Sequence, residues 1–581
     1  MYEKMKRIAV IILSCFAAAA FCMAGNHHNL RVISTGDVHG AWFPESYVSP
    51  GRLNSSLMSV KHFVDSVRAA VGKDNVLLLD AGDCLQGDNA AYYFNNVTAD
   101  RPHLFPRISA YMGYDAIVVG NHDIEAGHRV YDRVFDELAG YGIPWLGGNA
   151  LKTDGGTYFP EYAVFQKAGL KVLVIGFTNA NIGAWVADEE WEGMTFCPIV
   201  SRAQSVVDRL TAKENPQIVI MVVHSGTGDG DGSQLESEGK DLFGTLKGVD
   251  LLICGHDHRP FVIDEDVTDL VDGGSKASMV GMSSFDVETR GQRVLSKTAV
   301  TEVVRLDKNV YDKEMEEKFR PDFEEVKAFT LRPVGNLEVS LRTRDAYVGM
   351  SDYVNLLHRV QLSRPGVQLS FAAPLKYDSE VKSGQVVFND MFTIYPYENQ
   401  LVVAKLKGSE IKSILEFSYD GWIGNGDEHV LKIQNRPDER TGSEKWSFVG
   451  RPYNFDSVGG LVYTVDVTKP CGGRICIKSM ADGGAFDPEA FYNVAMTSYR
   501  ANGGGDIIPL GAGLSDAEMA SRIVAKDKEI RMIVYDFFLA HPIVNRELIN
   551  DESVIGHWEF VPAEAAGKIL EKDMKLLFGD R

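Results

Sequence analysis

Between residues 30 and 258 the chain returns repeatedly to short runs of Val, Ile and Leu. Continuous apolar runs of this length are typical of strands that are buried on both faces of a sheet. The stretches between them, such as 57–71 and 129–141, have apolar residues at helical spacing. This alternation predicts a layered α/β domain. The predicted strands are residues 30–34, 76–80, 115–120, 170–177, 218–223 and 249–254.

The pattern changes at residues 311–329, which are charged, rich in helix-forming residues and interrupted by Pro321. We predict a solvated connecting helix, broken at this proline, between two domains. After it, alternating strands mix with helical segments in 389–419, 459–468 and 491–505, which predicts a second, α+β domain. The predicted boundaries are 28–305 for the first domain, 306–334 for the linker helix and 335–565 for the second domain.

Residues 1–24 begin with basic side chains, continue as an apolar stretch and end in small residues. This is the pattern of a cleaved secretory signal, and no stop-transfer pattern follows it. Phe21 is a poor residue before a lipidated Cys22, so a cleaved signal is favoured over a lipoprotein anchor. We therefore expect a periplasmic or secreted protein whose mature chain has no transmembrane span.

Charge narrows the classes of partner. The 581 residues include 59 basic and 80 acidic side chains, for a formal net charge of −21. A nucleic-acid polymer or an anionic membrane needs clustered Lys and Arg, so neither is expected as a partner. A small phosphorylated substrate remains compatible, because metal ions can supply positive charge locally.

The cysteines leave one alternative open. Cys471 and Cys476 could close a small hairpin loop as a disulfide, or both could remain reduced. Cys84 and Cys254 stand near candidate metal ligands, but neither belongs to a Cys-x-x-Cys pair. We expect both to be buried packing residues.

Five of the predicted strands end in side chains that can bind metals. In an α/β sheet the crevice beyond the carboxyl ends of the strands is where ligands bind, so these side chains should converge. They are too many for one ion with open positions, whereas two divalent ions that share a carboxylate would use them. Zn²⁺, Mn²⁺ and Fe²⁺ all accept Asp and His ligands. The strand ends deliver Asp37, His39, Asp83, Asn121, His122, His224, His256 and His258.

These strand ends carry a family resemblance. The series GDVHG (36–40), GDCLQG (82–87), GNHD (120–123), VVHSG (222–226) and GHDH (255–258) resembles the five-block signature of the calcineurin-like metallophosphoesterases. The C-terminal half resembles the second domain of the exported 5′-nucleotidase group. The resemblance implies a layered metallophosphoesterase sandwich followed by an α+β substrate domain. It also implies that Asp37, His39 and His258 hold one ion, that Asn121, His224 and His256 hold the other, and that Asp83 bridges them.

The resemblance separates His122 from the metal ligands. In the family the histidine of Gly-Asn-His faces the substrate phosphate, and a residue three positions later orients it. Here that residue is Glu125, where 5′-nucleotidases more commonly have Asp and the cyclic phosphodiesterases have Asn. His122 and Glu125 are therefore the candidate catalytic residues.

Features of the second domain favour one branch of the group. FAAPLK (371–376), NFDSVGGLVYTVDVT (454–468) and SYRANGGG (498–505) resemble the 2′,3′-cyclic-nucleotide 2′-phosphodiesterase/3′-nucleotidases. By the same resemblance the base would lie against Tyr397, Asn399 and Tyr499, since stacking on aromatic rings tolerates different bases. Lys376 and Arg500 are weaker candidates for substrate contact, with solvated surface charge as the alternative.

The sequence thus predicts an exported phosphohydrolase with two divalent ions that acts on nucleotides. A 2′,3′-cyclic-nucleotide 2′-phosphodiesterase/3′-nucleotidase is favoured, with a 5′-nucleotidase or a broader nucleotide phosphatase as the alternative. A nucleotide-binding protein without turnover is a third hypothesis. It is disfavoured because a binder needs neither the complete ligand set nor His122.

Overall fold

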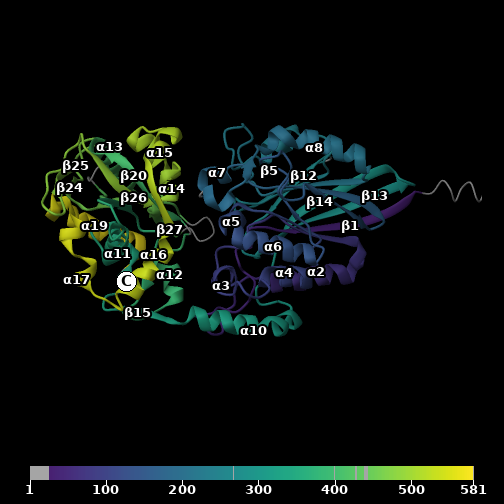
Figure 1. Ribbon diagram of the computed structural model, residues 1–581, viewed down its shortest axis with the longest axis horizontal. Helices are drawn as coiled ribbons and strands as arrows, with labels where there is room; N and C mark the ends of the chain where they lie inside the picture. The colour runs from purple at the N-terminus through teal and green to yellow at the C-terminus, as the bar shows by residue number, and fades with distance from the viewer. Residues whose placement is uncertain are drawn as a thin grey trace, which may run out of the picture. The chain divides into compact units, whose positions relative to one another are not determined.

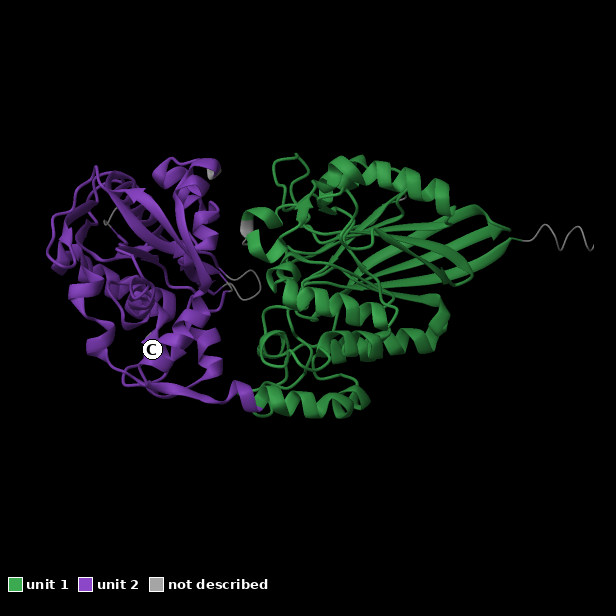
Figure 2. Ribbon diagram, viewed as in Figure 1, with its two compact units in different colours: residues 1–327 green, residues 328–581 purple. Residues whose placement is uncertain are grey.

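The computed structural model describes residues 25–186, 188–265, 267–397, 399–424, 428–437 and 443–579. The predicted signal at residues 1–24 lies outside these ranges. The chain divides into two compact units, with the division between Lys327 and Ala328 (Figure 2).

Unit 1 contains two six-stranded sheets (Figure 1). The first has the order β14-β13-β1-β2-β3-β4, in which β1 to β4 run parallel and β13 and β14 form an antiparallel hairpin beside β1. Its strands are β1 (Asn26–Thr35), β2 (Val76–Asp80), β3 (Ala116–Val118), β4 (Trp145–Leu146), β13 (Met279–Arg290) and β14 (Arg293–Arg305).

The second sheet of unit 1 has the order β11-β12-β10-β9-β7-β6, with four parallel strands between two antiparallel edges. Side chains of both sheets, such as Val32 and Val174, share one buried core, so the sheets pack face to face. The strands are β6 (Tyr162–Lys167), β7 (Leu170–Phe177), β9 (Ile218–Val223), β10 (Leu251–Cys254), β11 (Pro260–Ile263) and β12 (Asp269–Gly273). All six predicted strands are confirmed, as is the layered α/β class.

Helices cover the outer faces of the two sheets. Apolar residues of α2 (Leu57–Val71), α4 (Leu104–Met112) and α6 (His128–Gly140) pack on the first sheet. The second sheet is covered by α8 (Ile199–Glu214) and α9 (Gly239–Thr245). Each sheet is therefore buried on both faces, as the continuous apolar runs predicted.

The predicted break and the full solvation of the connecting segment are both wrong. α10 runs from Lys313 to Thr330 with Pro321 inside it. Met315 and Phe319 before the proline, and Phe323 and Val326 after it, are buried in the core of unit 1. Burial on both sides of Pro321 keeps the helix continuous although one backbone hydrogen bond is lost.

Unit 2 is a mixed α+β domain, as predicted. Its largest sheet has the order β23-β17-β26-β20-β27, and its two three-stranded sheets have the orders β25-β24-β29 and β19-β15-β28. The helices include α11 (Asp352–Leu362), α12 (Phe388–Ile394), α13 (Gly408–Trp422) and α14 (Ser498–Ala501). The strands of the largest sheet are β17 (Leu369–Ala372), β20 (Gln400–Lys407), β23 (Ser457–Gly459), β26 (Phe491–Thr497) and β27 (Ile523–Glu529). Those of the two smaller sheets are β15 (Pro333–Leu337), β19 (Gly384–Val387), β24 (Leu461–Asp466), β25 (Ile475–Met480), β28 (Ile543–Val544) and β29 (Gly556–Val561).

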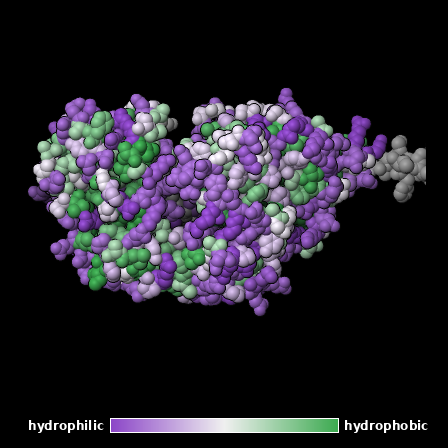
Figure 3. All heavy atoms as spheres, in the orientation of Figure 1, coloured by the Kyte–Doolittle hydropathy of each residue, from purple (hydrophilic) through white to green (hydrophobic). Residues whose placement is uncertain are grey.

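The cysteines of the described residues are free thiols, so the disulfide alternative for Cys471 and Cys476 is not formed. Both of these are exposed, whereas Cys84 and Cys254 are buried, as expected. No helix within the described ranges is both long and apolar enough to cross a membrane. The face shown in Figure 3 is mostly hydrophilic, with scattered hydrophobic side chains.

Candidate active site

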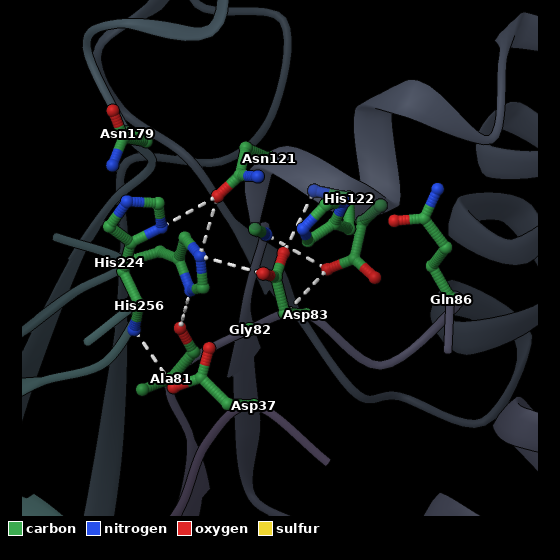
Figure 4. A network of polar contacts seen from close by, with 12 residues as sticks. Asp37, Ala81, Gly82, Asp83, Gln86, Asn121, His122, Asn179, His224 and His256 are labelled. Atoms are coloured by element: carbon green, nitrogen blue, oxygen red, sulfur yellow. Dashed lines mark hydrogen bonds and ion pairs between the residues drawn. The ribbon is translucent and has the colours of Figure 1, made fainter. Parts of the chain in front are cut away.

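The predicted ligands of unit 1 converge from both sheets (Figure 4). The loops after β1, β2 and β3 bring Asp37, Asp83 and Asn121 from the first sheet. The second sheet contributes His224 after β9, and His256 and His258 after β10. Strand ends that are far apart in sequence therefore supply one cluster.

Backbone strain is concentrated at this cluster. Five of its residues that are not glycine have φ between 48° and 82°, which is rare for side chains with a Cβ. Hydrogen bonds between the loops hold the strain in place, including Asp37 N to Gly82 O and His39 N to Asp83 O, both 2.9 Å. The strained residues are Asp37, His39, Asp83, His256 and His258.

One group of donors contains Asp37, His39 and His258. The Nε2 atoms of the two imidazoles lie 2.8 Å apart, and Asp37 Oδ1 lies 3.3 Å from His258 Nε2. His39 Nδ1 lies 3.0 Å from the Gln86 carbonyl oxygen. If Nδ1 donates its proton there, the lone pair of His39 Nε2 is free for a cation.

A second group contains Asn121, His224 and His256. Asn121 Oδ1 lies 2.9 Å from His224 Nε2 and 3.0 Å from His256 Nδ1 (Figure 4). The other ring nitrogen of His224 lies 2.8 Å from the Ala81 carbonyl oxygen. This contact orients the imidazole so that Nε2 points into the group.

Asp83 lies between the two groups. Its Oδ2 is 3.1 Å from His224 Nε2 and 4.0 Å from His39 Nε2, while its Oδ1 accepts a hydrogen bond from His122 N–H at 2.9 Å. A Cβ at Gly120 would lie 2.1 Å from this Oδ1, so only glycine fits beside the carboxylate.

Two buried carboxylate oxygens show that the cluster fits metal. Asp83 Oδ2 and Asp37 Oδ1 are buried and make no hydrogen bond of good geometry within the part of the chain that the structure describes, although ring nitrogens of His224 and His258 lie 3.1 and 3.3 Å from them. Buried charged oxygens without such bonds are costly unless a cation satisfies them. Carboxylate, imidazole and amide donors in two groups with one carboxylate between them suit a pair of divalent ions.

The pKa values of the candidate ligands are consistent with metal binding. Burial alone would raise the pKa of Asp83, but His224, His122 and His39 lower it well below its usual value. Burial lowers the pKa of His39 to about 3 and that of His256 to about 4, so both are neutral, as metal ligands must be. His224 differs, because burial lowers its pKa but the Asp83 and Asp37 carboxylates and the Ala81 carbonyl together raise it to about 9. A metal ion bound there would displace that proton.

His122 stands apart from both groups, on the short helix α5 (Asn121–Glu125). Its Nδ1 lies 2.7 Å from Glu125 Oε2, and its ring centroid lies 5.4 Å from that of His39. The His122 side chain is one-third exposed, so it can reach a substrate next to the cluster.

Asp123 is a structural residue of the site that the sequence reasoning missed. Its buried carboxylate accepts hydrogen bonds from the backbone N–H groups of Gly120, Asp83, Cys84 and Leu85 at 2.8–3.1 Å. Burial and the Asp83 charge raise the pKa of Asp123 to about 6. Asp123 belongs to the GNHD block, but its sequence position did not show that its carboxylate would bond to the loops of both Gly120 and Asp83.

In unit 2 the predicted base-binding residues share one pocket. Tyr397, Asn399 and Tyr499 line a cavity of about 320 Å³. Tyr397 and Tyr499 are 40% and 42% exposed, so their rings can accept a ligand. Tyr453, which the sequence reasoning missed, also lines the pocket. Its ring centroid lies 6.2 Å from Tyr397 and 6.5 Å from Tyr499, nearly perpendicular to each.

The structure corrects both expectations for Arg500, because its guanidinium is neither solvated nor on the pocket wall. Arg500 is buried, with Nε 2.8 Å from Asp456 Oδ2 and Nη1 3.0 Å from Asn454 Oδ1. The pairing holds Asp456, which does line the pocket. Lys376 is partly exposed, and its Nζ lies 3.4 Å from the Phe392 carbonyl oxygen.

Comparison with known proteins agrees with both units. Residues 30–260 match the calcineurin-like phosphoesterase family, and residues 333–510 match the 5′-nucleotidase C-terminal domain. A 2′,3′-cyclic-nucleotide 2′-phosphodiesterase/3′-nucleotidase of Haemophilus influenzae is 24% identical over 97% of this chain and 92% of its own length. A trifunctional nucleotide phosphoesterase of Bacillus subtilis is 22% identical over 94% of this chain, which spans only 40% of that relative.

A solved structure agrees in fold. A Staphylococcus aureus protein described as a 5′-nucleotidase, solved with α-ketoglutarate, superposes with a TM-score of 0.73 at 20% identity. The match covers 92% of this chain and 99% of that one. The solved structure shows the fold alone, whereas the calcineurin-like phosphoesterase match and the relatives make the chain a metal-dependent phosphoric ester hydrolase. The chain joins a calcineurin-like phosphoesterase domain to a 5′-nucleotidase C-terminal domain.

Proposed function

We propose that this protein hydrolyses nucleotides with two divalent ions, and that 2′,3′-cyclic nucleotides and 3′-nucleotides are its main substrates. The observation that carries the proposal is the cluster of two donor groups around Asp83, with two buried carboxylate oxygens facing imidazole nitrogens and His122 beside them. Zn²⁺, Mn²⁺ and Fe²⁺ all suit these ligands.

In the proposed site Asp37, His39 and His258 hold one ion, Asn121, His224 and His256 hold the other, and Asp83 bridges them. Such a pair of ions would activate water and neutralise charge on the phosphoryl group.

His122 then acts on the leaving group. With Nδ1–H bonded to Glu125, a protonated His122 can donate from Nε2 to the departing sugar oxygen, or bond to a phosphoryl oxygen. Glu125 holds the ring in that orientation. In unit 2, Tyr397, Asn399 and Tyr499 would bind the base.

The preference for cyclic and 3′-phosphates is supported by the second-domain segments FAAPLK and SYRANGGG, and by the activity for which the Haemophilus influenzae relative is named. A 5′-nucleotidase is the second candidate, supported by the C-terminal domain match. Purified full-length protein should be assayed with 2′,3′-cyclic AMP, 3′-AMP, 5′-AMP and bis(p-nitrophenyl) phosphate, after chelation and after Mn²⁺ or Zn²⁺ is restored. Preferred turnover of 5′-AMP would favour the second candidate.

Export is part of the proposal and rests on residues 1–24. Amino-terminal sequencing of protein recovered from the extracytoplasmic fraction tests it. A first residue near position 25 is expected, whereas recovery of an intact amino terminus from the cytoplasm would contradict export.

A further inference from the structure

The nucleotide pocket of unit 2 contains two buried polar groups with unmet hydrogen-bonding capacity. Gln361 Oε1 on α11 has no hydrogen-bond partner among the described residues, and the Tyr395 hydroxyl after α12, which lies near the Asn399 side chain, has no acceptor for its proton there. Both side chains are 1% exposed, and both line the pocket of Tyr397 and Tyr499. A buried polar group with unmet capacity is unfavourable in the free protein, so two on one pocket wall call for a ligand.

Most of the other buried side chains of this cavity are apolar. Leu357, Phe371 and Ala372 are at most 5% exposed, and the buried Asp456 carboxylate is paired with Arg500. Tyr397, Tyr453 and Tyr499, by contrast, are partly exposed. An aromatic ligand stacked at the exposed tyrosines would therefore turn one edge toward the buried wall, where Gln361 and Tyr395 supply its polar groups.

The hydrogen-bonding roles of Gln361 Oε1 and the Tyr395 hydroxyl restrict which edge of a base can face them. Gln361 Oε1 only accepts hydrogen bonds. Burial raises the pKa of Tyr395, an effect that nearby Asn399 reduces, so its hydroxyl is protonated and can donate. An acceptor beside a donor is complementary to an amino group beside an unprotonated ring nitrogen, as in adenine and cytosine. A keto group beside a ring N–H, as in hypoxanthine and uracil, presents the opposite pattern.

We propose that Gln361 and Tyr395 select nucleobases that carry an amino group next to an unprotonated ring nitrogen. The inference rests on the proposed function in taking a nucleotide as the ligand. It goes beyond that function by assigning base preference to two side chains outside the stacking tyrosines.

The test is binding of adenosine and inosine to the full chain by titration calorimetry. These nucleosides differ only in the edge concerned, and they contain no phosphate, so binding does not depend on turnover. Wild type should bind adenosine roughly 10-fold more tightly than inosine, as expected for hydrogen bonds made to one and not the other. Gln361→Met and Tyr395→Phe should each bring this ratio close to one.

Thermal unfolding of the ligand-free protein separates recognition from a structural role. Gln361→Met removes the amide that carries the unpaired Oε1, and Tyr395→Phe removes a hydroxyl whose proton has no acceptor, so Tm should change little in either variant. Tyr353→Phe is the matched control, because its buried hydroxyl donates to the Ile394 carbonyl oxygen at 2.8 Å and Tyr353 does not line the pocket. This control should lower Tm and leave the adenosine to inosine ratio unchanged.

Two results would overturn the inference: a wild-type preference for inosine, or an unchanged ratio in both variants. Either could occur while 2′,3′-cyclic AMP is still hydrolysed, in which case the proposed function stands. If no nucleotide is hydrolysed but the ratios shift as expected, the proposed function fails and the inference stands.

Discussion

His122 and Glu125 form a hydrogen-bonded pair within one turn of α5, with His122 Nδ1 2.7 Å from Glu125 Oε2. Glu125 departs from the Asp and Asn that the family resemblance makes more common at this position, yet its carboxylate reaches the ring nitrogen of His122. The pair can therefore orient the imidazole through Glu125.

We predict that His122→Ala lowers kcat by about 10²–10⁴ while bound metal stays near the wild-type level, because His122 acts as an acid and not as a ligand. Glu125→Gln should cause a smaller loss in kcat, since it alters only the orientation and charge around the ring. Metal analysis and steady-state kinetics check both. His128→Ala is the matched control, because His128 also pairs with a carboxylate, Asp132, at 3.1 Å. Loss of metal in His122→Ala would make it a ligand instead.

Asp83→Ala should remove the carboxylate between the two donor groups, so we expect loss of bound metal and of turnover. Added Mn²⁺ or Zn²⁺ should raise the Tm of the chelated wild type, because ligands that bind only the folded state stabilise it. The same addition should have little effect on the Tm of Asp83→Ala. A variant that retains two ions per chain and normal turnover would exclude the bridging role.

The location of the metal cluster could be predicted because it depends on short-range signals. Each apolar run marks a strand, and the residues after it mark that strand's end, as for Asp37 after β1 and His224 after β9. Since the carboxyl ends of parallel strands share an edge, convergence follows without knowledge of long-range contacts. The division of these strands between two facing sheets did not follow, because continuous apolar runs look alike in either sheet.

Features that depend on distant partners were missed. Arg500 is buried because Asp456, 44 residues earlier, neutralises it, and a charge in sequence gives no sign of such a partner. Tyr453 reaches the pocket from a turn whose position depends on the fold of unit 2. For α10 a local signal did exist, since Met315, Phe319, Phe323 and Val326 recur at spacings of three and four. The weight given to Pro321 and to the charges obscured it.

Substitution of the pocket tyrosines should lower kcat/KM for nucleotides but not for a substrate without a base. Tyr397→Ala or Tyr499→Ala removes stacking of roughly 1–3 kcal/mol, so kcat/KM for a nucleotide should fall by about 5- to 150-fold. Tyr453→Ala should cause a loss in the same direction, because its ring contacts both of the others edge-on. An aryl phosphate, which has no base, should be hydrolysed at nearly the wild-type rate by all three variants. Equal losses on both substrates would show that the rings only support the fold.

A buried histidine of unit 2 should make stability depend on pH. His358 on α11 has Nδ1 2.7 Å from Ser370 Oγ and Nε2 3.1 Å from Ser457 Oγ, and burial lowers its pKa from 6.5 to about 3. Below pH 6.5 the unfolded chain binds a proton that the folded chain does not, so stability falls as pH falls toward 3.

At pH 5 this histidine should cost about 2 kcal/mol of unfolding free energy relative to pH 7. His358→Gln cannot take up the proton, so its loss between pH 7 and pH 5 should be smaller than that of wild type by about this amount, whatever its stability at pH 7. Urea unfolding of chelated protein at the two pH values measures the difference. His62→Gln, which removes an exposed histidine of unit 1, is the control. Equal losses in wild type and His358→Gln would contradict the prediction, because the imidazole of His358 would then take up its proton without unfolding. Its burial between Ser370 and Ser457 argues against that outcome.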